Sequence, residues 1–76
     1  MNFFDYHIKK VWFTDVEIWI ELDNGKSASL LLKNFKPLLN ATPEERNSYE
    51  ITSDGSALHW EKLDEDLSAE GFFQRA

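Results

Sequence analysis

The feature that most restricts the fold of this chain is a run of strictly alternating apolar and polar residues that ends in a turn. The apolar positions are Val16, Ile18, Ile20 and Leu22, and Glu17, Trp19 and Glu21 lie between them. A period of two is typical of a β-strand that turns one face to a core. We therefore expect an antiparallel sheet at the centre of the fold.

Side-chain parity selects the turn after this strand. A two-residue Asn24-Gly25 loop would place Ile20 opposite Ser29, so that an apolar and a polar side chain share a face. A three-residue loop, with Gly25 in the left-handed conformation as a bulge, aligns apolar side chains instead. We predict this second register, which pairs Ile20 with Ala28, Ile18 with Leu30 and Val16 with Leu32.

The first hairpin, around Thr14 and Asp15, completes a three-stranded meander from Tyr6 to Leu32, but its register stays open. Tyr6, Ile8 and Trp12 lie on one parity of the first strand, and Val11 and Phe13 lie on the other. Either register leaves apolar groups on both faces, and Trp19 stands among glutamates on the outer face of the second strand. That face needs partial cover, from helical segments of the same chain or from a partner protein or second copy.

The pattern changes after the meander. The residues Phe35, Leu38 and Leu39 have helical spacing, but Pro37 favours a single turn or a 3₁₀ segment. A capping signal follows in Thr42-Pro43-Glu44-Glu45, which predicts a short helix from Pro43 to about Ser48. Two β-prone runs, 49–52 and 57–60, then flank an Asp-Gly turn and predict a second hairpin.

The C-terminal stretch, 61–73, carries five of the fourteen acidic residues. Ser68 or Asp66 can cap a last helical turn, and the pair Phe72-Phe73 is expected to dock the C-terminus. No repeat or linker divides the chain, so residues 1–76 are predicted to form one domain. The predicted class is α+β: a three-stranded antiparallel meander, short helical segments, a second β-hairpin and a C-terminal helical turn.

Composition argues against several functions. A net charge of −6 is the wrong sign for direct contact with nucleic acid. The chain has no cysteine, which leaves neither disulfides nor thiolate ligands and fits a reducing cytoplasm. The start, MNFFDYHIKK, lacks the pattern of a signal peptide, and the apolar stretches are three residues or fewer, so no membrane contact is expected.

Three stretches of the chain carry a family resemblance. They are 38–46, 49–60 with its Leu58-His59-Trp60 end, and 60–71 with Leu63-Asp64-Glu65-Asp66-Leu67-Ser68. Together they resemble the bacterial domain-of-unknown-function family 2442 over nearly the whole chain. The resemblance implies a small cytoplasmic α+β protein without an established reaction, often encoded beside another small protein in pairs that look like toxin and antitoxin. It brings no catalytic residues.

Motifs for catalysis or metal binding are weak in this sequence. The histidines, His7 and His59, have no nucleophile motif near them, so an enzyme that uses His59 is only a remote alternative. The three glycines form no phosphate-binding string. Alternating Asp64, Asp66, Ser68 and Glu70 imitate the opening of a calcium loop, but Ala69 and Arg75 replace its glycine and its glutamate. We expect no catalytic residue, cofactor or metal.

These observations favour a non-enzymatic protein-binding module. The family resemblance implies the role of the antitoxin-like member of a two-gene pair. Its partner would be another small protein, such as the product of the adjacent gene, and the module itself a monomer or weak homodimer. The alternative is an acidic decoy that occupies a nucleic-acid-binding protein. The predicted partner-binding residues are aromatic or acidic: Trp12, Trp19, Glu61, Asp64, Glu65, Asp66 and Glu70.

Overall fold

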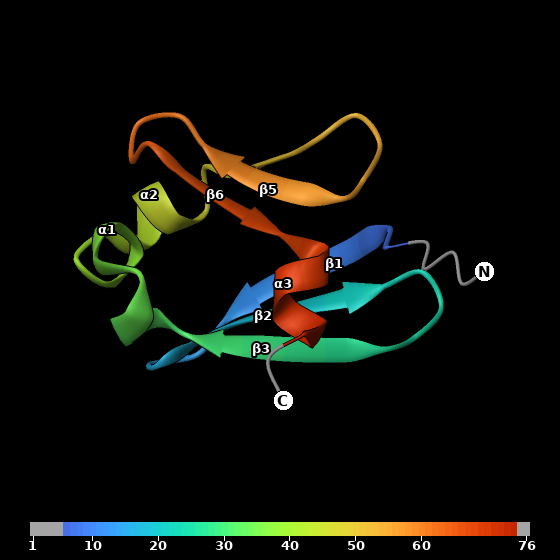
Figure 1. Cartoon of the computed structure of the whole chain (residues 1–76). Coiled ribbons are helices and arrows are strands. Elements are labelled where there is room, and N and C mark those ends of the chain that lie inside the picture. Colours follow the sequence, from blue (N-terminus) through green and yellow to red (C-terminus); the bar gives the residue numbers. More distant parts are fainter. Residues whose placement is uncertain (1–5, 75–76) are drawn as a thin grey trace.

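The meander forms as predicted and is one of two sheets that face each other in the computed structural model (Figure 1), which describes residues 6–74. Sheet A contains β1 (Ile8–Phe13), β2 (Glu17–Leu22) and β3 (Ser27–Leu31) in that order. Sheet B contains β4 (Glu50–Ile51), β5 (Ala57–Trp60) and β6 (Glu65–Ser68). All neighbouring strands are antiparallel. The prediction that the chain start is not a signal peptide concerns residues 1–10, of which 1–5 lie outside the described residues.

The register predicted for the hairpin of β2 and β3, around Gly25, is confirmed. Ile20 pairs with Ala28 and Ile18 pairs with Leu30. Gly25 has a φ of 87°, the left-handed conformation that the three-residue loop requires. Ile18 and Ile20 therefore face the same side of the sheet as their apolar partners on β3.

The open register of the first hairpin is resolved by a β-bulge in β1. Ile8 pairs with Leu22, but Lys10 already pairs with Glu21, so one extra residue is inserted between them. Parity changes at the bulge. Ile8 and Val11 therefore both face the core, although they lie on opposite parities in the sequence.

The prediction that Val16 belongs to the core face of the second strand is wrong. Its side chain is 60% exposed, and β2 begins one residue later. The cause is local: Thr14 Oγ1 accepts hydrogen bonds from the backbone N–H groups of Val16 and Glu17, at 3.3 and 3.0 Å. This side-chain-to-backbone turn holds Val16 in the loop.

Short helical segments connect the two sheets. A 3₁₀ turn, η1 (Leu32–Asn34), leads into α1 (Lys36–Leu39) and then α2 (Pro43–Arg46). The predicted capping box is present, because the Thr42 hydroxyl accepts from the N–H of Glu45 while the Glu45 carboxylate accepts from the N–H of Thr42. The helix ends two residues earlier than predicted.

The second hairpin is confirmed as β4 and β5, with Gly55 at a φ of 76° in its turn. Sheet B has a third strand, β6, within the stretch that was expected to be only a capped turn. The sequence did not predict this strand because it contains Glu65 and Asp66, and aspartate and glutamate are depleted in strands. Ser68, not Asp66, caps the final helix, α3 (Ala69–Phe73), by accepting from the N–H of Gly71.

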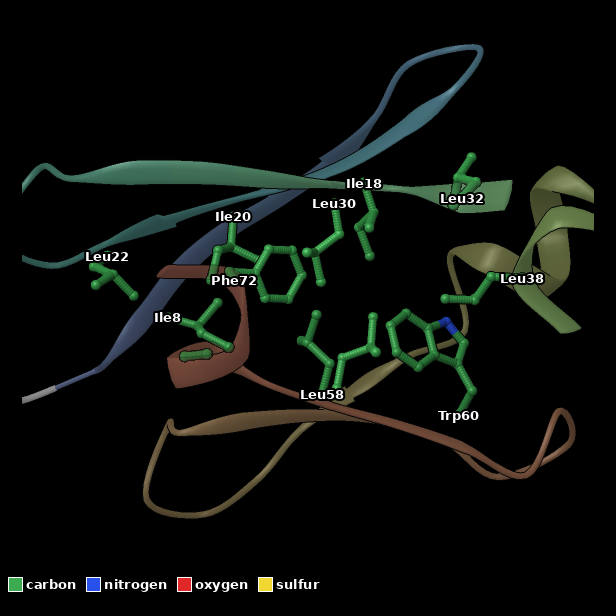
Figure 2. Packing of buried hydrophobic residues seen from close by; sticks show 12 residues of the cluster. Ile8, Ile18, Ile20, Leu22, Leu30, Leu32, Leu38, Leu58, Trp60 and Phe72 are labelled. Atoms are coloured by element: carbon green, nitrogen blue, oxygen red, sulfur yellow. The ribbon is translucent and has the colours of Figure 1, made fainter. Parts of the chain in front are cut away.

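The core lies between the two sheets (Figure 2). Leu58 and Trp60 of sheet B point toward Ile18 and Leu30 of sheet A, and Phe72 of α3 fills the space beside them. Trp60 is fully buried, so its indole requires a hydrogen-bond acceptor. The buried apolar set is Ile8, Ile18, Ile20, Leu22, Leu30, Leu32, Leu38, Leu58, Trp60, Leu67, Ala69 and Phe72. The chain is thus an α+β protein of two layers.

Candidate functional site on the outer face of sheet A

Two tryptophans are stacked on the outer face of sheet A, the face turned away from the core. Trp12 of β1 lies directly opposite Trp19 of β2, with ring centroids 5.7 Å apart and ring planes 9° apart. Trp12 is 40% exposed, and Trp19 is half-buried beneath it. The indole N–H of Trp19 donates to the Glu17 carboxylate at 3.1 Å, so the polar atom of that ring already has a partner. The site therefore presents a partly exposed pair of stacked aromatic rings.

Within residues 6–74, the helices do not bury the stacked tryptophans, contrary to the alternative that helical segments of the same chain cover this face. Figure 1 shows α3 against the side of sheet A that faces sheet B, and α1 and α2 at one end of the sheets. The end of α2 approaches Trp12: Pro43 and Arg46 of α2, and Asn47 after it, line a cleft of about 260 Å³ with Trp12 and its strand neighbours. The tryptophans shield each other instead.

More apolar surface continues from the pair toward the end of β3. Leu31 follows the parity of Trp19 and is 41% exposed, as is Leu39 of α1. Together with Val16 they line a mainly apolar cleft of about 300 Å³, whose rim carries Asp15 and Lys33. We call Val16, Leu31 and Leu39 the leucine cleft.

The acidic residues predicted for partner binding do not form one patch. Glu61 and Asp64 lie in the turn between β5 and β6, and Glu65 and Asp66 begin β6. Glu70 lies on α3, beyond the opposite end of β6, and accepts a hydrogen bond from the Gln74 amide at 2.7 Å. Three residues separate Asp66 from Glu70: Leu67 and Ser68 of β6, and Ala69 of α3. The first four acids therefore lie in or next to one turn, with Glu65 and Asp66 on opposite faces of sheet B, and Glu70 lies on a different element.

A carboxylate, an imidazole and a second carboxylate form a row across the outer face of sheet B. His59 pairs with Glu50 of β4 on one side and with Asp66 of β6 on the other. Its Nδ1 lies 2.5 Å from Asp66 Oδ1. This hydrogen bond raises the pKa of His59 above its usual 6.5, with smaller contributions from the negative charges of Asp66, Glu50 and Glu61 and opposition from desolvation.

His59 and Asp66 have the pairing of a base and its orienting carboxylate, but a catalytic arrangement also requires a nucleophile in a pocket. The pair lies on an exposed sheet surface and forms a cross-strand hydrogen bond, which becomes an ion pair when His59 is protonated. Among residues 6–74, no three histidine, aspartate or glutamate side chains are grouped as metal ligands. The calcium-like positions are dispersed over a turn, a strand and α3, and Arg75 lies outside the described residues.

Sequence reasoning identified the two tryptophans but missed the leucine cleft. Val16 was assigned to the core, and Leu31 and Leu39 were read only as parts of a strand and a helical turn. A signal was available for Leu31, because the confirmed register places it opposite Glu17 on the outer face. No comparable signal exists for Leu39, since its position depends on how α1 folds back beside β3.

The fold and site define the class of this protein as a small two-layer α+β protein with an exposed aromatic sheet face. It belongs to the family described as protein of unknown function (DUF2442), whose model matches residues 8–76. Comparison with curated proteins and with solved structures finds no match. None of the helices between residues 6 and 74 is long and apolar enough to span a membrane.

Proposed function

We propose that this protein is a non-enzymatic binding module that docks another small protein on the outer face of sheet A. The observation that carries the proposal is the stacked pair of Trp12 and Trp19, held rigidly by two paired strands and left partly exposed. Large aromatic side chains dominate the energy of protein interfaces. Their rigidity lowers the entropic cost of binding.

The surroundings of the pair support a docking role for this face. Leu31 and the leucine cleft extend the apolar surface on one side, and Glu17 and Glu21 give the same sheet face a polar, acidic border. An apolar centre with a polar rim is the usual anatomy of an interface. The acids around the β5–β6 turn would assist encounter with a basic partner surface.

The partner proposed is the product of an adjacent gene, with this chain as the antitoxin-like member of the pair, in the cytoplasm. The acidic decoy is the second candidate, and it predicts carboxylates spaced along one face. Glu61 and Asp64–Asp66 do cluster at one turn, but Glu70 is separate from them, which supports the decoy less than the aromatic pair supports a docking face.

Co-expression tests the proposal. The chain is produced with the product of each adjacent gene, purified through a tag on this chain alone, and examined for a stoichiometric complex. We expect one complex, which persists in high salt because apolar contacts dominate it, whereas a decoy complex would dissociate steeply as salt rises. Failure of every co-encoded protein to co-purify would contradict the proposed function.

A further inference from the structure

The two edges of sheet A differ in how they are protected against pairing with another strand. The edge strand β1 has a bulge, two adjacent lysines at Lys9-Lys10, and a first residue fixed by a hydrogen bond from Ile8 N–H to the Gly55 carbonyl. The edge strand β3 pairs with β2 in an uninterrupted register and contains no charge or proline. Bulges, charges and prolines are among the devices that protect edge strands, and β3 lacks these three.

The hydrogen-bond pattern shows which groups of β3 are free to pair. Leu22 N–H donates to the Lys26 carbonyl, and Leu32 N–H donates to the Val16 carbonyl. The backbone N–H and C=O groups of the even-numbered residues from 26 to 32 therefore point toward β2. The backbone groups of the intervening residues point to the open side of the sheet. Those residues are Ser27, Ser29 and Leu31. Within residues 6–74, no segment other than β2 forms a ladder with β3, which borders the sheet in Figure 1.

A site for a side chain lies at the end of this edge. The leucine cleft begins at Leu31, the last residue of β3, and continues over Val16 and Leu39. A strand added antiparallel to β3 would therefore place its amino-terminal part beside the cleft. One apolar side chain there would fix the register of the added strand, as pockets do in other cases of strand addition.

Charge indicates the chemistry of the added strand. No aspartate or glutamate occurs from Asn24 to Pro43, although the whole chain has fourteen of them. The same segment contains Lys26, Lys33 and Lys36, so the stretch of chain that forms the edge strand and its flanks carries only positive charges. The nearby acids lie on the other side of β3, as Glu17 and Glu21 of β2, and at the cleft rim, as Asp15 beside Lys33. Electrostatic complementarity favours an acidic segment at this edge.

The same charges disfavour a second copy of this chain. Antiparallel pairing of two β3 strands about Ser29 would place Lys33 of each copy beside Lys26 of the other, at both ends of the new ladder. Like charges in such positions are destabilising. Each copy would also bring a net charge of −6.

We propose that the open edge of β3 binds an extended acidic segment of a partner protein as a fourth strand of sheet A, with one apolar side chain of that segment in the leucine cleft. The inference rests on the proposed function, because both describe a protein-binding module. It concerns the strand edge, whereas the proposed function concerns the aromatic face.

The test uses a synthetic peptide and needs no identified partner. The probe is an end-blocked peptide that alternates valine with threonine, with a leucine near its amino end and a glutamate at each end. Amide hydrogen exchange is followed by NMR. With peptide at about ten times its dissociation constant, exchange at Ser27, Ser29 and Leu31 should slow about tenfold. Exchange at Ala28 and Leu30, which already face β2, should not change.

Two control peptides separate strand pairing from general adhesion. A peptide methylated at alternate backbone nitrogens cannot form the ladder and should not slow exchange, and this control leaves the protein unaltered. A peptide with lysines in place of the glutamates should bind about tenfold more weakly, because two favourable charge contacts become unfavourable. The variant Ser29→Pro removes an N–H that faces the open edge and should abolish binding.

The outcomes distinguish the two proposals. Loss of peptide binding in Ser29→Pro together with retention in Trp12→Ala supports strand addition at β3, whether or not a co-encoded partner exists. No slowing with millimolar peptide, or equal binding of the methylated or lysine peptide, would overturn it. Slowing at Ser29 that depends on protein concentration without peptide would identify a second copy as the occupant and would also overturn it.

Discussion

The rings of Trp12 and Trp19 stack across two neighbouring strands at a centroid distance of 5.7 Å, on the face of sheet A opposite the core. This relationship separates the two roles of tryptophan in the protein. Trp60 is fully buried and stabilises the fold, whereas Trp12 is 40% exposed and contributes mainly surface. The stacked pair is therefore available for binding at little cost to folding.

Replacement of these tryptophans should affect stability very differently. Trp60 Nε1 donates to the Arg46 carbonyl at 2.9 Å and the ring lies in the core, so Trp60→Ala should lower the free energy of unfolding by about 3–5 kcal/mol. Trp12→Ala loses one stacked contact and should cost less than about 1.5 kcal/mol. Urea unfolding followed by circular dichroism measures both. Equal costs would contradict the assignment of Trp12 to the surface.

The two glycines with positive φ should tolerate alanine unequally. A Cβ on Gly25 would meet nothing within 4 Å, so Gly25→Ala should cost only its backbone strain, about 1–2 kcal/mol. A Cβ on Gly55 would lie 3.3 Å from the His7 ring, and the Gly55 carbonyl also accepts from Ile8. We expect Gly55→Ala to be the more destabilising variant.

A double-mutant cycle isolates the contact with the ring. His7→Ala in the Gly55→Ala background should recover part of the loss, because the nearest clashing atom belongs to the imidazole. Thermal unfolding of the four proteins gives the coupling. Additive effects, or a larger loss in Gly25→Ala, would show that the Gly55–His7 approach is unimportant.

Protonation of His59 should stabilise the fold. Its pKa is raised in the folded state, first by the hydrogen bond to Asp66, so the folded protein holds the proton more tightly than the unfolded chain does. The added stability should be fully present below pH 6.5, the usual value, and should be lost as pH rises through the folded pKa. An NMR titration of the His59 ring protons measures this pKa.

The variant Asp66→Asn is the matched control for the titration. It removes the charged acceptor while keeping the strand, so the His59 midpoint should move down toward 6.5. The pH dependence of stability in this window should diminish with it. An unchanged midpoint would show that Asp66 is not the main cause.

Protonation of Asp54 should destabilise the fold, in contrast to protonation of His59. Hydrogen bonds from the hydroxyls of Ser56 and Thr52 lower its pKa from 3.8 to about 2. Its contribution to stability should be complete above pH 3.8 and lost as pH falls toward 2. Titration of the Asp54 carboxyl by carbon-detected NMR checks the value, and Ser56→Ala should raise it. A normal midpoint in the intact chain would contradict the turn geometry.

The sequence predicted the parts of the fold that local rules determine. Parity around Gly25 determined the register of β2 and β3, and the Thr42–Glu45 capping signal marked the start of α2. Two features escaped these rules. The bulge between Ile8 and Lys10 depends on pairing with β2, and β6 forms because Leu67 joins a core most of whose members lie far away in sequence.

The candidate site was predictable only in part, for the same physical reason. Trp19 stands out in the sequence because it is a large apolar residue at a position of the strand that alternation assigns to the outer face. Its stacking on Trp12 depends on the register of the first hairpin, which the sequence left open. The leucine cleft combines a turn, a strand end and α1, so its residues meet only after folding. Residue spacing could not reveal that juxtaposition.

The most direct test of the docking face is a titration of the co-purified partner against matched surface variants. Trp12 and Ile51 are both large apolar residues of similar exposure, 40% and 41%, but Ile51 lies on β4 of sheet B. Calorimetry should show that Trp12→Ala weakens binding by about thirtyfold or more, as expected for an interface hot spot, whereas Ile51→Ala leaves it within about threefold. Equal affinity of the Trp12→Ala and unaltered proteins would contradict the assignment of the aromatic pair as the docking surface.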